Sequence, residues 1–174
     1  MAIRSTDART DQIREGDHIF SFNATERKLK YFLSNGMMQW FVEARGNGSA
    51  AGFGTNGDTP PGLYQLMDPQ WLSDKDKDAR GFGRWFIPMT PSISATYVEN
   101  KRKDLGIHGG GSDLPSPFAG RQGWETTLGC IRLQNEDLNR VAYAVQRALK
   151  TGSLAWLHVG WETIVDGKKI LKMY

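Results

Sequence analysis

The sequence predicts a mainly β domain of the α+β class with one principal amphipathic helix. Short runs of β-branched and aromatic residues recur along the chain and are separated by turn-forming residues. Only one segment, residues 136–150, has apolar residues at the three- and four-residue spacings of a helix. A chain of 174 residues is long enough to enclose one hydrophobic core.

The composition is that of an ordinary globular domain, with 39% hydrophobic residues, 24% charged residues and a net charge of +3. No block of Lys and Arg marks a nucleic-acid-binding surface, so we expect no nucleic-acid partner. No apolar run approaches the roughly 20 residues of a membrane-spanning helix, so no membrane span is expected. The single cysteine, Cys130, excludes an internal disulfide.

The first 17 residues are polar and predict an N-terminal lead-in to one catalytic domain over residues 18–174. This lead-in lacks the apolar core of a signal peptide. Three interpretations follow: the protein is made for the cytosol, it is exported by a route without such a signal, or a signal was removed from it.

The first half of the chain contains four predicted strands, at residues 19–22, 28–33, 39–44 and 63–67. Ser34-Asn35-Gly36 predicts a hairpin between the second and third, because Asn-Gly tolerates positive φ at both central positions. Residues 45–62 are rich in glycine and predict a loop. Residues 73–78 alternate in charge and predict a surface loop, since the glycine and glutamate of a calcium-binding loop are missing downstream.

The second half contains further strand-like runs at residues 84–88, 96–98, 154–159, 163–165 and 168–172. Pro88 and Pro91 are expected at a sheet edge or a strand end, because proline donates no hydrogen bond. In the helix, Asn135 is the expected N-cap and Gly152 the terminating residue. Asp166-Gly167 predicts a hairpin between the last two runs.

Cys130 and His108 are the residues with the clearest catalytic potential. A thiol becomes a strong nucleophile when a base or a positive environment favours the thiolate, so a Cys and a distant His form a candidate dyad if the fold brings them together. Acyl transfer also needs N–H donors for the developing oxyanion, and the backbone of residues 128–130 is a candidate source. The alternative is that Cys130 is a buried small apolar residue.

The remaining histidines predict no second site. His18 and His158 lie in strand-like apolar surroundings and are expected to be partly buried with hydrogen-bond partners. A zinc site of His108, Cys130 and another histidine has no familiar close ligand spacing. We therefore expect no metal and no cofactor.

The glycine run 109–111 followed by Ser112 has two interpretations. A phosphate-binding loop would need a following Lys-Ser/Thr pair, which is absent, so a mobile flap over the thiol is favoured. Trp85 and Trp124 are either borders of a substrate groove or packing residues.

Two segments resemble the signature of the L,D-transpeptidase catalytic domain family. They are Ile107-His108-Gly109 and Thr127-x-Gly129-Cys130-Ile131-Arg132-Leu133. Thr59-Pro60-Pro61-Gly62 also resembles the family's turn into its next strand. The resemblance covers roughly residues 18–135 and implies an L,D-transpeptidase-like β-sandwich.

The resemblance also implies a reaction on peptidoglycan stem peptides. Cys130 would be the nucleophile, His108 the base, and the carbonyl of Gly109 would orient the imidazole. The implied reaction breaks the diaminopimelate–D-alanine bond through a thioester and passes the acyl group to an amine, a D-amino acid or water. The residues implied to line the substrate or oxyanion site are Thr127, Leu128, Gly129, Arg132 and Trp124.

Leu128 departs from the family pattern, because many members carry a histidine directly before the Gly-Cys pair. If that histidine helps to bind or polarise substrate, hydrolysis or D-amino-acid exchange is favoured here over cross-linking. The expected site of action is the bacterial cell envelope (periplasm). The protein would be either a housekeeping enzyme or an antibacterial effector with a secretion-system and immunity partner. A non-catalytic wall-binding module and an unrelated cysteine hydrolase are the alternatives.

Overall fold

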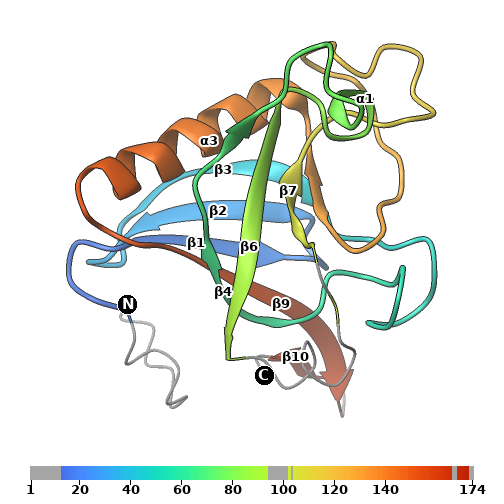
Figure 1. Ribbon diagram of the computed structural model, residues 1–174. Helices are drawn as coiled ribbons and strands as arrows, with labels where there is room; N and C mark the ends of the chain where they lie inside the picture. The colour runs from blue at the N-terminus through green and yellow to red at the C-terminus, as the bar shows by residue number, and fades with distance from the viewer. Residues whose placement is uncertain (1–12, 94–101, 103, 166–167, 173–174) are drawn as a thin grey trace.

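A computed structural model describes residues 13–93, 102, 104–165 and 168–172 (Figure 1). The predicted strand at 96–98 and residues 1–12 of the predicted lead-in lie outside these residues. The described strands are β1 (His18–Asn23), β2 (Lys28–Leu33), β3 (Met38–Arg45), β4 (Gly62–Leu66), β5 (Gln70–Trp71), β6 (Trp85–Ile93), β7 (Gly106–His108), β8 (Ile131–Leu133), β9 (Ala155–Val165) and β10 (Lys168–Lys172). The described helices are α1 (Ala79–Phe82) and α3 (Asn135–Lys150).

The strands form one sheet that closes on itself. Its order is β1-β2-β3-β8-β7-β6-β4-β9-β10, and β1 also pairs with β9, so the first eight of these strands form a ring. The pairs β1–β9 and β7–β8 are parallel, and the other pairs are antiparallel. A closed sheet leaves few unpaired backbone groups to protect. The predicted mainly β sandwich fold is therefore confirmed.

Helix α3 lies beside the sheet and covers part of the core (Figure 1). It contacts β6, β7 and β9 through one apolar face. The buried apolar residues of this face are Leu138, Val141, Ala142, Val145 and Ala148. Gly152 follows the helix with φ +78 and donates to the carbonyl of Leu149 at 3.1 Å, as expected of a terminating glycine.

The prediction of Asn135 as the N-cap is wrong. Gln134 holds the N-cap position in an extended conformation, with no side-chain capping bond, and Asn135 is the first helical residue. The Asn135 side chain is buried and makes its hydrogen bonds to other segments. The Asn135 side chain therefore bonds to these segments instead of capping the helix.

Both predicted hairpins are present. β2 pairs with β3, and Phe32 lies opposite Met38 next to a register shift. Gly36 has φ +82, but Asn35 keeps a negative φ and its side chain accepts from the N–H of Met37 at 2.9 Å. The turn is therefore wider than the two-residue mirror-image type. In the second hairpin Val165 lies opposite Lys168, while residues 166–167 lie outside the described part of the chain.

The two predicted loops are also confirmed. β3 ends at Arg45 and β4 begins at Gly62, so the glycine-rich segment connects strands. Residues 73–78 are all exposed, and Asp76 accepts hydrogen bonds from the N–H and the hydroxyl of Ser73.

The prediction that Pro88 and Pro91 lie at a sheet edge or a strand end is wrong, because both lie within β6, which runs between β7 and β4 inside the sheet. Pro91 pairs with Tyr64 where the register shifts. Pro88 pairs with Gly106, at the first residue of β7. Each proline thus lies at a ladder end or a bulge, where a missing N–H costs little.

Candidate active site

Strands β7 and β8 bring the two halves of the motif together. They run parallel, with Ile107 opposite Ile131 and His108 opposite Arg132. Successive side chains of a strand point to opposite faces. Ile107 and Ile131 are fully buried in the core, so His108, Arg132 and Cys130, which precedes Ile131, face the other way.

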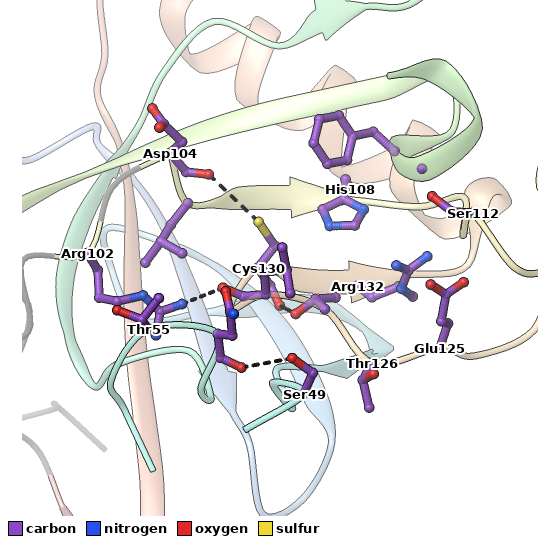
Figure 2. A pocket seen from close by; sticks show the side chains of 16 residues that line it. Ser49, Thr55, Arg102, Asp104, His108, Ser112, Glu125, Thr126, Cys130 and Arg132 are labelled. Atoms are coloured by element: carbon purple, nitrogen blue, oxygen red, sulfur yellow. Dashed lines mark hydrogen bonds between the residues drawn. The ribbon is translucent and has the colours of Figure 1, made fainter. Parts of the chain in front are cut away.

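This second face forms the floor of a cavity of about 600 Å³ (Figure 2). His108, Cys130 and Arg132 line it, and most of the other lining residues have charged or polar side chains. The other charged and polar side chains on its walls are Ser49, Thr55, Asn56, Arg102, Asp104, Ser112, Glu125, Thr126 and Thr127. A concave site with a nucleophile, a base and convergent polar groups is the arrangement expected of an active site.

His108 is held as a neutral imidazole. Its ring is 3% exposed, and burial, with a further contribution from the positive charge of Arg132, lowers its pKa to about 3. Its Nδ1 lies 2.8 Å from the carbonyl oxygen of Gly109. A carbonyl only accepts, so Nδ1 carries the proton and Nε2 keeps a free lone pair. This tautomer is the one that a general base needs.

Cys130 is held as a neutral thiol. Its side chain is 7% exposed, and burial raises its pKa to about 11. The N–H of Gly106 and the charges of Arg102 and Arg132 act in the opposite direction, since each stabilises a thiolate. The Sγ donates weakly to the carbonyl of Asp104 at 3.9 Å, as Figure 2 shows.

The glycine run after His108 is anchored, so the prediction of a mobile flap is wrong. The N–H groups of residues 109, 110 and 111 donate to the carbonyl of Phe82, the side chain of Asn135 and the carbonyl of Arg80, at 2.9, 3.0 and 3.0 Å. Arg132 donates to the carbonyls of Gly109, at 3.0 Å, and Gly110. A Cβ at Gly109 would lie 2.0 Å from Asn135 Oδ1, so close packing explains this glycine.

The turn before Cys130 is ordered by Thr127. Its hydroxyl donates to the carbonyl of Cys130 at 2.8 Å and accepts from the N–H of Gly129 at 3.1 Å. That N–H is therefore already used within the turn. The N–H groups of residues 128 and 130 remain the candidate oxyanion donors of this segment.

Of two other residues implied to line the site, Leu128 does so and Trp124 does not. Leu128 lines the cavity and is 64% exposed. Trp124 is not among the described residues that line it, and the guanidinium of Arg45 stacks on its ring at 4.3 Å. Trp85 is a packing residue: it is 7% exposed and donates to Asn139 at 3.0 Å.

Four residues around the site escaped prediction: Thr59, Arg102, Asp104 and Asn135. The position of Asn135 at the start of the helix predicted a capping role, so its contact with the loop after His108 was not expected. Arg102 and Asp104 lie in a charged run whose pattern is that of a solvated loop. Thr59 belongs to the threonine-proline turn, and its buried hydroxyl donates to the carbonyl of Gly129 at 2.9 Å.

The remaining histidines lie elsewhere. His18 is partly buried and its Nδ1 lies 2.5 Å from the hydroxyl of Tyr31, as expected for a histidine with a partner. His158 is also partly buried. Among the described residues, no group of three or more His, Cys, Asp or Glu side chains is placed to bind a metal ion.

The closed β fold and this cavity define the chain as a mainly β domain with a candidate cysteine–histidine catalytic site. Residues 17–165 match the family model described as L,D-transpeptidase catalytic domain (YkuD), and the chain belongs to this family. Among curated protein sequences, none matches the chain. In the described part, no helix combines the length and apolarity required to cross a membrane.

The solved structures that share the fold include those of two bacterial proteins. Bd1075 of Bdellovibrio bacteriovorus is 16% identical, with a TM-score of 0.58 over 90% of this chain and 50% of that one. The helical cell shape determining protein Pgp2 of Campylobacter jejuni is 19% identical, with a TM-score of 0.59 over 88% of this chain and 50% of that one. The chain therefore spans about half the length of these two proteins.

Proposed function

We propose that this protein is a cysteine acyltransferase that attacks the diaminopimelate–D-alanine bond of peptidoglycan tetrapeptide stems. One observation carries the proposal: Cys130 and His108 occupy the same face of the β7–β8 pair and line one cavity. The Gly109 carbonyl fixes the imidazole tautomer that leaves Nε2 free to accept a proton. These are the nucleophile, base and orienting group of acyl transfer.

In the first step, Cys130 Sγ bonds to the carbonyl carbon of diaminopimelate while its proton passes to His108 Nε2. The carbonyl π electrons move to oxygen, which becomes the oxyanion of a tetrahedral intermediate. The hydrogen bond from Nδ1–H to Gly109 is strengthened when the ring becomes an imidazolium. The backbone N–H groups of residues 128 and 130 are our candidate donors to the oxyanion.

In the second step, the intermediate collapses, the C–N bond breaks and D-alanine leaves with the proton from Nε2. A thioester remains on Cys130. An incoming amine or water then gives a proton to Nε2 and attacks the thioester carbon. The C–S bond breaks, the thiol is regenerated, and the product is a cross-linked, exchanged or hydrolysed stem.

The neutral resting state suits a proton transfer that accompanies attack. The pKa of Cys130, at about 11, and that of His108, at about 3, both disfavour a thiolate–imidazolium pair in the empty cavity. Burial opposes each charged form. We infer that the ion pair develops only as the substrate carbonyl takes up the negative charge.

Leu128 favours hydrolysis or exchange over cross-linking in this proposal. It occupies the position before Gly-Cys where many members of the family carry a histidine, and a leucine side chain forms no hydrogen bond. A large acceptor amine would therefore lack a polar contact from the side chain of residue 128. Water and small D-amino acids depend less on such a contact.

The proposed substrate places the activity in the bacterial cell envelope. A housekeeping enzyme and a delivered antibacterial effector would share this chemistry. Forced expression in the periplasm separates them: an effector is toxic there, and a neighbouring immunity protein relieves the toxicity.

Mass spectrometry of tetrapeptide muropeptides tests the proposal. Wild type is expected to remove D-alanine or exchange it for an added D-amino acid, and Cys130→Ala to do neither. His18→Gln is the control, because His18 lies outside the cavity. Equal behaviour of wild type and Cys130→Ala would instead favour a non-catalytic wall-binding module.

A further inference from the structure

Arg102 is a buried cation on the cavity wall whose described hydrogen-bond partners are all backbone carbonyls. Its side chain is 5% exposed. Nη1 donates to the carbonyls of Phe53, at 3.1 Å, and Gly54, and Nη2 donates to that of Leu128 at 2.5 Å. No carboxylate of the described residues forms an ion pair with it. Its charge therefore acts on the cavity. The Asp104 carboxylate lines the same cavity and acts in the opposite direction, because it raises the pKa of Cys130.

The guanidinium packs directly against the residue before the nucleophile. A Cβ on Gly129 would lie 1.6 Å from Arg102 Nη2, and Gly129 has φ +111. The glycine thus serves two needs, a left-handed backbone and room for the guanidinium. Figure 2 shows Arg102 and His108 on different sides of Cys130.

Arg102 also joins two segments that are distant in sequence. The glycine-rich loop contributes the carbonyls of Phe53 and Gly54, and the turn before Cys130 contributes that of Leu128. The same loop and turn meet again where Ser49 N–H donates to the carbonyl of Thr127 at 3.0 Å. A planar fork of N–H donors suits such simultaneous contacts, whereas a lysine ammonium does not.

The two buried arginines, Arg132 and Arg102, contact different parts of the site. Arg132 donates to the carbonyls of Gly109 and Gly110, on the histidine side. Arg102 holds the cysteine side, and its charge opposes the burial that raises the pKa of Cys130. A positive charge near a thiol stabilises the thiolate relative to the thiol.

We propose that Arg102 is a positioning residue for Cys130: its guanidinium fixes the turn of residues 128–130 against the glycine-rich loop and supplies positive charge to the developing thiolate. This inference rests on the proposed acyl transfer at Cys130. It assigns a role to a residue outside the two motifs that define the site.

Two substitutions separate geometry from charge. Arg102→Met removes both, while Arg102→Lys keeps the charge and loses the fork. Arg121→Met is the matched control, because Arg121 is exposed and outside the cavity. Cys130 is the one cysteine of the chain, so iodoacetamide reports its thiolate without ambiguity.

Alkylation rate against pH is measured in the absence of substrate, and kcat and KM are measured for D-alanine release. Arg102→Met is expected to move the alkylation profile up by about one pH unit, which is about tenfold slower alkylation at a fixed pH below the thiol pKa. Its kcat is expected to fall by at least about tenfold, with a smaller change in KM. Arg102→Lys is expected to keep the alkylation profile and still lose kcat.

The proposal is overturned if the alkylation profile of Arg102→Met superimposes on that of wild type, or if Arg121→Met shifts it equally. Thermal unfolding identifies a variant that fails to fold. If Arg102→Met fails, Arg102→Lys decides: a wild-type kcat overturns the proposal, and a reduced kcat with an unchanged alkylation profile supports it. If wild type releases no D-alanine but the Arg102→Met alkylation profile is shifted, the proposed function is refuted. The effect of Arg102 on the Cys130 thiolate is still supported in that case.

Discussion

The side chain of Asn135 accepts a hydrogen bond from the backbone N–H of Gly110 at 3.0 Å, which ties the start of α3 to the loop after His108. Its amide nitrogen donates to the carbonyls of Pro117, at 2.8 Å, and Ala119, at 2.6 Å. One buried amide therefore satisfies three backbone groups, in two loop segments. Because Gly109 lies between His108 and Gly110, this amide also helps to hold the carbonyl that orients the imidazole.

Asn135→Ala is expected to lower both stability and turnover. It leaves the N–H of Gly110 and two carbonyls without partners, at a cost of about 1–3 kcal/mol per buried group that stays unsatisfied. The helix itself should persist, because Asn135 caps nothing. Chemical denaturation and D-alanine release measure the two effects. A fully active Asn135→Ala protein would show that the loop after His108 holds its conformation without this amide.

Gly109→Ala is expected to abolish most activity. The new Cβ would meet Asn135 Oδ1 at 2.0 Å, so either the loop or the asparagine must move. Gly120→Ala is the control, because Gly120 is exposed, its φ is not positive, and the nearest atom to a Cβ there is Oε2 of the Glu136 side chain, at 3.3 Å. The comparison uses kcat for D-alanine release. Similar kcat values for the two variants would contradict the close packing at Gly109.

The pKa values of the dyad predict a stability optimum between about pH 6.5 and 9. Burial lowers the pKa of His108 from 6.5 to about 3, so the unfolded state binds more protons below pH 6.5 and stability falls as pH decreases. Burial raises the pKa of Cys130 from 9.0 to about 11, so the unfolded state loses its proton first and stability falls as pH rises above 9. Each slope is about 1.4 kcal/mol per pH unit.

The free energy of unfolding against pH checks this prediction, with His108→Gln and Cys130→Ala as references. His108→Gln should lose the part of the fall in stability below pH 6.5 that His108 causes, and Cys130→Ala the part above pH 9 that Cys130 causes. Parallel wild-type and His108→Gln curves between pH 6.5 and 4 would mean that His108 titrates normally.

Most of the longer strands and helix α3 could be predicted from local patterns, and the site only in part. The β2, β3 and α3 segments carry their own periodicity, so their ranges follow within one residue. The pairing of β7 with β8 does not follow from periodicity, because each described strand has three residues and their contact spans the chain between them. The motif resemblance supplied that link.

Arg102 shows why the rest escaped prediction. Its neighbours in sequence are charged, which is typical of a solvated loop, yet the folded chain buries it against two distant segments. Its partners are backbone carbonyls, and every residue carries one. Such a contact therefore cannot be predicted from a pattern of side chains. Trp124 is the opposite case, an aromatic residue near the motif whose ring stacks with Arg45 instead.

Leu128→His is expected to shift the products toward cross-linked stems. The side chain is 64% exposed on the cavity wall, and only its backbone carbonyl contacts Arg102, so an imidazole fits without loss of packing. A histidine there adds a hydrogen-bonding group where an acceptor amine would approach the thioester. The ratio of cross-linked dimers to hydrolysed monomers, measured by mass spectrometry, should rise several-fold, about 1 kcal/mol of differential transition-state stabilisation. Leu128→Gln is the matched control, because glutamine is polar but offers no group of intermediate pKa. An equal rise of the ratio in both variants would assign the effect to polarity alone. No rise in either variant would show that the residue before Gly129 does not select the acceptor.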